Sequence, residues 1–245
     1  MYVFNQTGIL KKTEEVKEKI KAAALKHWRS PADITVLAAS KARTIEEIKA
    51  AFNCGITVFG ENYVQEFLPK YEALHGIKEI KWHIIGRLQK NKVKHVVGKI
   101  CLIHSVNSAE LADVIDAVSF SKNTAANILL EINLSKEPAK TGLFFEDAIE
   151  AVIHINKLNN VVLKGFMTMP PLSVGGEDNR KYFKILKQIL EDVNYKAIYK
   201  SELNELSMGT SDDYEVAVEE GATIVRLGTV IFGKRPPKIK TNQNA

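Results

Sequence analysis

Short apolar runs recur along the chain, and each has the length and β-branched composition of a strand buried on both faces. Small or polar residues close each run, as expected where a strand ends. We predict eight strands, over residues 34–41, 57–62, 81–86, 100–106, 127–133, 162–169, 205–208 and 224–227.

Between these runs, apolar residues follow the three- and four-residue spacing that places them on one face of a helix. Thr44 with Glu47, and Asn107 with Glu110, have capping-box spacing, which predicts a helix start at each pair. Pro69 is expected to kink or split its helix. The predicted helices cover residues 12–28, 44–55, 64–74, 89–97, 107–120, 145–158, 178–193 and 212–220, with a short one from 229.

Regular alternation of strand and helix predicts a parallel sheet, because parallel neighbours need a crossover that is usually a helix. About eight such units in 245 residues predict an α/β fold, a single (β/α)8 TIM barrel. An open doubly wound sheet is the alternative, but no GxGxxG follows the first strand. We see no domain boundary and expect a barrel with an N-terminal helix over residues 1–235 and a flexible tail over 236–245.

Composition and charge exclude several classes of protein. Cys54 and Cys101 form no CxxC pair, which predicts that the protein lies in a reducing compartment, the cytoplasm. The N-terminus does not resemble a signal peptide. No apolar run reaches membrane-spanning length, and the scattered histidines predict no metal site. The formal charge of +5 would suit a protein that binds nucleic acid. The densest basic stretch, residues 90–95, has apolar residues at helical spacing and no aromatic neighbours, so it is better explained as a solvated helix face.

The first strand, ITVLAASK, ends in Lys41, where a lysine can be held out of water. Desolvation lowers the pKa of an ammonium group and leaves a neutral amine that can form a Schiff base with an aldehyde. A single lysine at a strand end is more often a solvated residue that opens the next helix. The other strand ends therefore decide between these interpretations.

In TIM barrels the reactive groups lie at the C-terminal strand ends, and loops after strands seven and eight commonly hold phosphate. Gly228 allows close backbone approach, Thr229 starts a helix, and Ser207, Gly209 and Thr210 would complete an anion cradle. Ordinary turn chemistry explains each of these residues alone. Together with the lysine on strand one and an arginine on strand eight, they predict a site for an aldehyde that carries a phosphate, with pyridoxal 5′-phosphate (PLP) as the candidate.

Several motifs carry a resemblance to a known family. They are ASK at 39–41, FGENYVQE at 59–66, WHIIGRLQKNK at 82–92, KTG at 140–142 and ELSMGTSDDYEVAVEEGATIVRLGTVIFGKR at 205–235. On these motifs the chain resembles the YggS/PROSC family of pyridoxal phosphate homeostasis proteins, whose barrel is similar to the N-terminal domain of bacterial alanine racemase.

The resemblance implies that Lys41 holds PLP as a Schiff base and that Arg226 faces the pyridine nitrogen. Lys140 would be a second lysine, involved in handing the cofactor over. Ser207, Gly228 and Thr229 would hold the phosphate, and Asn62 and Met208 would line the ring. The predicted cofactor-binding residues are Lys41, Asn62, Ser207, Met208, Gly209, Arg226, Gly228 and Thr229.

An arginine beside the pyridine nitrogen disfavours its protonation and so weakens carbanion chemistry. The chain also ends near the point where the barrel closes, so a second proton-transfer partner is expected to be missing. The first hypothesis is a non-catalytic, monomeric carrier that buffers PLP and supplies it to PLP-dependent apoenzymes.

One enzymatic alternative remains open, and a second is discounted. The chain could be a PLP-dependent amino-acid racemase with His83 or Tyr63 as the acid/base, although His83 is better explained as a hydrogen-bonded core histidine. A Schiff-base aldolase without a cofactor would need a lysine at the end of strand six, and Lys164 lies at its start, the wrong end of the barrel.

Overall fold

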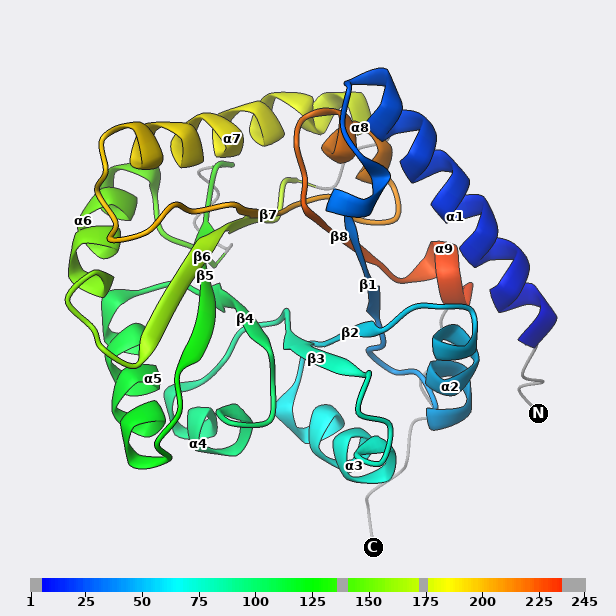
Figure 1. Cartoon of the computed structure of the whole chain (residues 1–245), viewed down its shortest axis with the longest axis horizontal. Coiled ribbons are helices and arrows are strands. Elements are labelled where there is room, and N and C mark those ends of the chain that lie inside the picture. The colour runs from blue at the N-terminus through cyan, green and yellow to red at the C-terminus, as the bar shows by residue number, and fades with distance from the viewer. Residues whose placement is uncertain (1–5, 136–140, 172–175, 235–245) are drawn as a thin grey trace, which may run out of the picture.

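The computed structural model describes residues 6–135, 141–171 and 176–234, and Figure 1 shows them as a barrel of strands ringed by helices. All strand pairs are parallel, each strand pairs with its successor, and β8 pairs with β1, so the barrel is closed. The TIM-barrel prediction is confirmed. The strands are β1 (Thr35–Ala39), β2 (Val58–Glu61), β3 (Lys81–Ile84), β4 (Leu102–Val106), β5 (Ala126–Ile132), β6 (Val161–Thr168), β7 (Glu205–Ser207) and β8 (Ile224–Leu227).

The helices lie in the predicted segments. A helix is shorter than predicted where its apolar face is short. They are α1 (Gln6–Lys26), α2 (Ile45–Asn53), α3 (Val64–Leu74), α4 (Val93–Val96), α5 (Ala109–Ser121), α6 (Phe145–Ile155), α7 (Arg180–Tyr195), α8 (Tyr214–Glu219) and α9 (Thr229–Phe232). Single 3-10 turns lie at η1 (Pro31–Asp33), η2 (Lys90–Lys92) and η3 (Gly176–Asn179). The capping box of Thr44 and Glu47 is confirmed at the start of α2.

Several predictions at helix starts and within helices differ from the structure. The N-cap of α5 is Ser108, whose hydroxyl accepts from the Leu111 N–H, and not Asn107. Helix α1 starts six residues earlier than expected, because Ile9 continues its buried face. Helix α3 continues through Pro69, which lies on its exposed face, so the proline does not split the helix, and the predicted kink stays a prediction.

Helix α1 lies across the outside of α8 and α9, so the first helix covers the last strand-helix unit (Figure 1). Lys19 and Lys26 contact Glu215 and Glu219 of α8 at 2.9 and 2.7 Å. Arg29, just beyond α1, donates to two backbone carbonyls, of Val218 and Ala222. The first helix of the described sequence is thereby held against a helix near its end.

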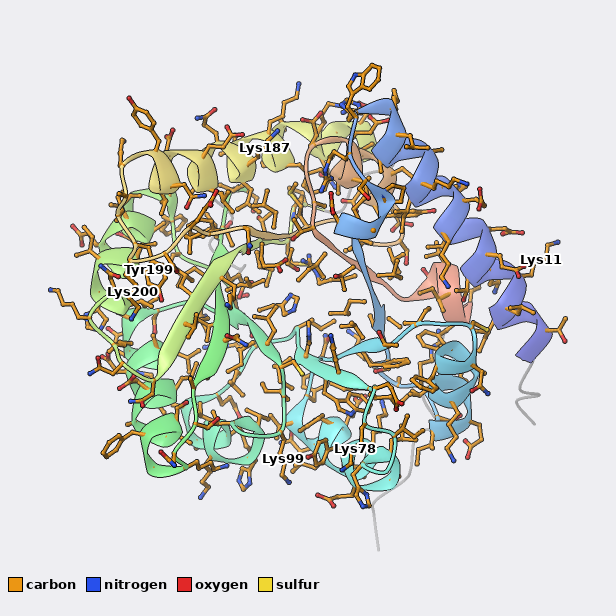
Figure 2. The ribbon with its side chains drawn as sticks, in the orientation of Figure 1. Lys11, Lys78, Lys99, Lys187, Tyr199 and Lys200 are labelled. Atoms are coloured by element: carbon orange, nitrogen blue, oxygen red, sulfur yellow. The ribbon has the colours of Figure 1, made fainter. Side chains whose placement is uncertain are left out.

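Side chains fill the middle of the barrel, whereas Lys11 projects outward from α1 (Figure 2). Apolar side chains from several strands form a small cluster inside the barrel, and a larger core lies between strands and helices. In the described part of the chain, no helix is both long and apolar enough to cross a membrane. The division into a barrel to 235 and a tail from 236 stays a prediction, because residues 235–245 lie outside the described ranges.

Candidate functional site

A cavity of about 380 Å³ opens at the C-terminal mouth of the barrel. This volume lies in the range of small-molecule sites, roughly 300–1,000 Å³. Five of the eight predicted site residues line it: Lys41, Asn62, Arg226, Gly228 and Thr229. Pairing of β1 with β8 therefore brings together the lysine and the glycine turn, which are almost two hundred residues apart in sequence.

The other three predicted residues lie behind this lining. The hydroxyl of Ser207 is buried beneath the cavity, where it contacts Arg226 and His104. Met208 is fully buried in the main hydrophobic core. Gly209 has a φ of +90°, and an added Cβ would lie 2.5 Å from the Cβ of Ala217. Glycine is therefore needed there for the backbone conformation and for packing against α8. Lys140 lies outside the described residues.

The loop that carries Lys41 is fixed on both sides of that residue. The carbonyl of Ser40 accepts from Nζ of Lys70 at 2.8 Å, and the Ala42 N–H donates to Glu66 at 2.9 Å. Ala42 has a φ of +58°, a backbone conformation that costs free energy in a residue with a Cβ and persists only where neighbours enforce it. These contacts therefore set the direction of the Lys41 backbone.

A buried ion pair supports this loop from below. Nζ of Lys70 lies 2.7 Å from Oε1 of Glu61, and the Ser40 hydroxyl donates to the same oxygen at 2.6 Å. Burial raises the pKa of the Glu61 carboxyl, and the charge of Lys70 opposes that rise. Glu61 is completely buried, so Lys70 is its main source of charge compensation.

Arg226 is held by contacts of both terminal nitrogens. One donates to the carbonyl and the hydroxyl of Ser207 at 2.7 and 2.6 Å, and the other to the Thr168 carbonyl and the Met169 sulfur at 2.9 and 2.8 Å. Burial lowers the pKa of Arg226 to about 10, which leaves it charged at neutral pH. These contacts involve both terminal nitrogens, and Nε–H is the remaining donor of the guanidinium group with respect to the described residues.

Sequence reasoning missed Ser211 and Glu131, which line the same cavity. The Ser211 hydroxyl accepts from the N–H groups of Gly228 and Val230 at 3.2 and 3.4 Å, so it borders the glycine turn. Glu131 accepts from the Thr141 hydroxyl at 2.6 Å, and burial raises the pKa of its carboxyl. A charged residue within the apolar run NILLEIN was the available signal for Glu131.

The remaining candidates lie away from this mouth. His83 is buried and hydrogen-bonded to His104 at 2.9 Å, as expected for a core histidine. Tyr63 is largely exposed before α3 and is not part of the cavity lining. Lys164 lines a second cavity that lies at the opposite, N-terminal strand ends, as expected. Among the described residues, no group of three or more His, Cys, Asp or Glu side chains could hold a metal ion.

The buried histidines predict acid sensitivity. Burial, followed by the charge of Lys81, lowers the pKa of His83 to about 4, and burial lowers that of His104 as well. Both stay neutral in the folded protein, whereas unfolded histidine binds a proton below about pH 6.5. Their contribution to stability is therefore complete above that pH and is lost as the pH falls.

We expect the free energy of unfolding to fall by about 1.4 kcal/mol per pH unit for each buried histidine below pH 6.5. Urea denaturation followed between about pH 6.5 and 5, a range above the ordinary carboxyl pKa values, would measure this slope. The His83→Phe variant should lose about half of the slope. A flat profile in the unmodified protein would contradict the prediction.

Comparisons with known proteins show which family this chain resembles over most of its length. Residues 16–236 match the family model described as alanine racemase, N-terminal domain. The chain is 44% identical to the pyridoxal phosphate homeostasis protein of Aquifex aeolicus, over 90% of this chain and 95% of that protein. It is 34% identical to the Escherichia coli K12 protein of the same name, over 90% and 94% of the two chains.

Solved structures have the same barrel. PipY of Synechococcus elongatus, solved with PLP bound, has a TM-score of 0.78 and 30% identity, covering 88% of this chain and all (100%) of that chain. Alanine racemase of Clostridium difficile 630, solved in complex with cycloserine, has a TM-score of 0.71 at 18% identity, covering 94% of this chain and 60% of that chain, a likeness of fold alone.

Proposed function

This chain belongs to the family of pyridoxal phosphate homeostasis proteins, and from that premise we propose that it binds PLP at the C-terminal mouth of its barrel. It would buffer the free aldehyde and deliver it to other proteins, without catalytic turnover of its own. The single observation that carries the proposal is that Lys41 and the Gly228–Thr229 turn line one cavity. An amine and an anion cradle are the two features that a phosphorylated aldehyde requires.

The glycine turn fits a phosphate group. A Cβ added at Gly228 would meet only Ala39, at 3.8 Å, so packing does not demand glycine there. Both residues line the cavity, and the space beside Gly228 therefore belongs to the site. We propose that the backbone of this turn and the hydroxyls of Thr229 and Ser211 hold the phosphate, with Ser211 replacing Ser207 in the expected set. A phosphate oxygen would then replace the Ser211 hydroxyl as acceptor for the Gly228 and Val230 N–H groups.

Lys41 would attach the cofactor. When bound, PLP supplies an aldehyde that condenses reversibly with amines and a ring that withdraws electrons. The fixed backbone at Ser40 and Ala42 directs the Lys41 side chain, and Asn62 borders the same space. We propose that the Lys41 amine holds the aldehyde as a Schiff base, which can be released by competing amines.

Arg226 favours a carrier over a racemase. Its remaining donor, Nε–H, would hydrogen-bond an unprotonated pyridine nitrogen, and a ring in that state is a weak electron sink. His83 and Tyr63, the acid/base candidates of the racemase alternative, are not part of the cavity lining. Glu131 is a titratable carboxyl that does line it, so α-proton exchange from L- and D-amino acids into solvent decides between carrier and racemase.

We also propose a cytoplasmic, monomeric protein whose partners are PLP-dependent apoenzymes that it meets transiently. Two free cysteines, Cys54 and Cys101, support a reducing compartment. Transfer to an apoenzyme needs only reversal of the Schiff base and an open mouth.

The test is to add PLP to the purified protein, record its absorption spectrum and reduce it with borohydride. We expect a Schiff-base band that disappears on reduction and a phosphopyridoxyl group on the peptide that contains Lys41. A protein that stays colourless and unmodified would overturn the proposal.

Gly228→Ala should weaken PLP binding with little change in stability. The new methyl group finds room beside Ala39 but occupies the cradle, so we expect roughly a tenfold rise in Kd, the effect of about 1.4 kcal/mol. Absorbance titration would measure Kd, and urea denaturation would measure stability. Gly209→Ala is the contrasting control, because its positive φ and the close Ala217 predict a loss of about 1–3 kcal/mol of stability. Equal Kd values for Gly228→Ala and the unmodified protein would count against the cradle.

A further inference from the structure

A chain of polar side chains crosses the interior of the barrel. Arg226 lines the cofactor cavity and donates to the Ser207 hydroxyl at 2.6 Å. That hydroxyl lies 2.8 Å from Nδ1 of His104, whose Nε2 lies 2.9 Å from Nδ1 of His83. His83 lines the second cavity, of about 320 Å³, at the opposite strand ends. Four strands, β8, β7, β4 and β3, contribute one residue each to this chain.

The proton positions along the chain follow from its first member. A guanidinium group can only donate, so the Ser207 oxygen must accept from Arg226. The buried hydroxyl proton of Ser207 also needs an acceptor, and Nδ1 of His104 is the one within reach among the described residues, so we infer that Ser207 donates to it. The proton of His104 then lies on Nε2 and is donated to Nδ1 of His83. His83 consequently carries its proton on Nε2, on the side of its ring away from His104. All four side chains are buried, and the two in the middle, Ser207 and His104, line neither cavity, so water has little access to them.

Loss of one acceptor in the middle of this chain would disturb Arg226. Without Nδ1 of His104, the buried Ser207 hydroxyl has no acceptor for its proton and turns toward another one. The Ser207 oxygen then presents a different direction to Arg226. Since the other terminal nitrogen of Arg226 is held by Thr168 and Met169, the guanidinium plane, and with it the Nε–H direction, must readjust.

We propose that His104 and His83 are positioning residues of the cofactor site. They hold the Ser207 hydroxyl, and through it the Arg226 guanidinium, in a single orientation from inside the barrel. His83 orients His104, and His104 orients Ser207. The inference rests on the proposed PLP site, because only a bound ring would report the orientation of Arg226 as affinity.

Two substitutions at His104 separate its contact with Ser207 from its contact with His83. The amide of asparagine ends near the position of Nδ1 and keeps an acceptor for Ser207, whereas that of glutamine ends near Nε2 and keeps only the contact with His83. We expect His104→Gln to raise the Kd for PLP by roughly tenfold or more and to shift the absorbance maximum of bound PLP. His104→Asn keeps the acceptor for Ser207 but loses its own contact with His83, so it should lie between the unmodified protein and His104→Gln in both measurements. Equal behaviour of the two variants would overturn the proposal.

The second cavity allows a rescue experiment. His83→Gly should weaken PLP binding, and added imidazole should restore it by entering from the Lys81 and Lys164 side of that cavity. His83→Phe fills the same space without a nitrogen and should be weak with or without imidazole. A purely structural role for His83 predicts the opposite order, with phenylalanine tolerated and imidazole without effect.

Nitrogen-15 spectra of the histidines in the unmodified protein without PLP test the chain independently of any variant. We expect His83 and His104 both to be protonated on Nε2 and bare on Nδ1. A proton on Nδ1 of His104 would overturn the proposal even if PLP binds. If the unmodified protein takes up no PLP, the proposed function fails. The spectra still decide whether the hydrogen-bonded side chains have these proton positions.

Discussion

Replacing Lys41 with alanine is expected to abolish borohydride trapping of PLP and to weaken binding by roughly a hundredfold or more, because the covalent bond is lost and only the polar contacts remain. Mass spectrometry of the reduced protein measures trapping, and equilibrium dialysis measures the residual affinity. The cavity itself should persist, since the backbone of this loop is fixed by Lys70 and Glu66 and not by the Lys41 side chain alone.

Lys41→Arg is the matched control for charge. Arginine keeps a positive charge at the same position but forms no Schiff base at neutral pH. We expect it to leave some non-covalent binding and no trapping. Full trapping on a different lysine in Lys41→Ala would contradict the assignment of the attachment site.

Replacing Lys70 with methionine should have the largest effect on stability. Removal of one member of a buried ion pair leaves an uncompensated charge and costs about 3–5 kcal/mol. Glu61 would remain fully buried with the Ser40 hydroxyl as its donor. The folded-state pKa of Glu61 is already raised, so in the variant the loss should be smallest at acidic pH and should grow as the pH rises and the carboxyl ionises.

Urea denaturation measures this loss, and two controls define it. Lys99→Met removes an exposed ion pair, with Glu72 at 3.3 Å, and should cost less than about 1 kcal/mol. Glu61→Gln combined with Lys70→Met should recover part of the stability, because no buried charge then remains. A similar loss in Lys70→Met and Lys99→Met would contradict the importance of the buried pair.

Much of the fold could be predicted because the signals are local. Buried parallel strands are continuous apolar runs, and that of β8 was predicted with both boundaries correct, Ile224 and Leu227. Boundaries were less certain where polar residues follow a strand, so β1 ends at Ala39 although the run was extended to Lys41. Hydrogen bonding to both neighbours decides where a strand stops, and that information is not local.

The site was predicted only in part, because the contacts that decide which residues face the cavity are also not local in sequence. Ser207 and Ser211 belong to one motif, and no local property distinguishes them. Ser207 ends β7 and turns into the barrel beneath the cavity, whereas Ser211 lies in the loop above and lines it. The buried partnership of His104 with Ser207 joins residues about a hundred positions apart, so only the closed barrel brings it into view.

Closure of the barrel by β8 against β1, with α1 fastened over α8, also bears on how the protein emerges from the ribosome. Strand β1 gains its second neighbour only after nearly the whole chain has been synthesised, so until then it presents an unpaired edge to other nascent chains. Lys41 and Gly228 likewise meet only in this last step. A growing polypeptide would therefore capture no aldehyde at this mouth until translation of its final strand was complete.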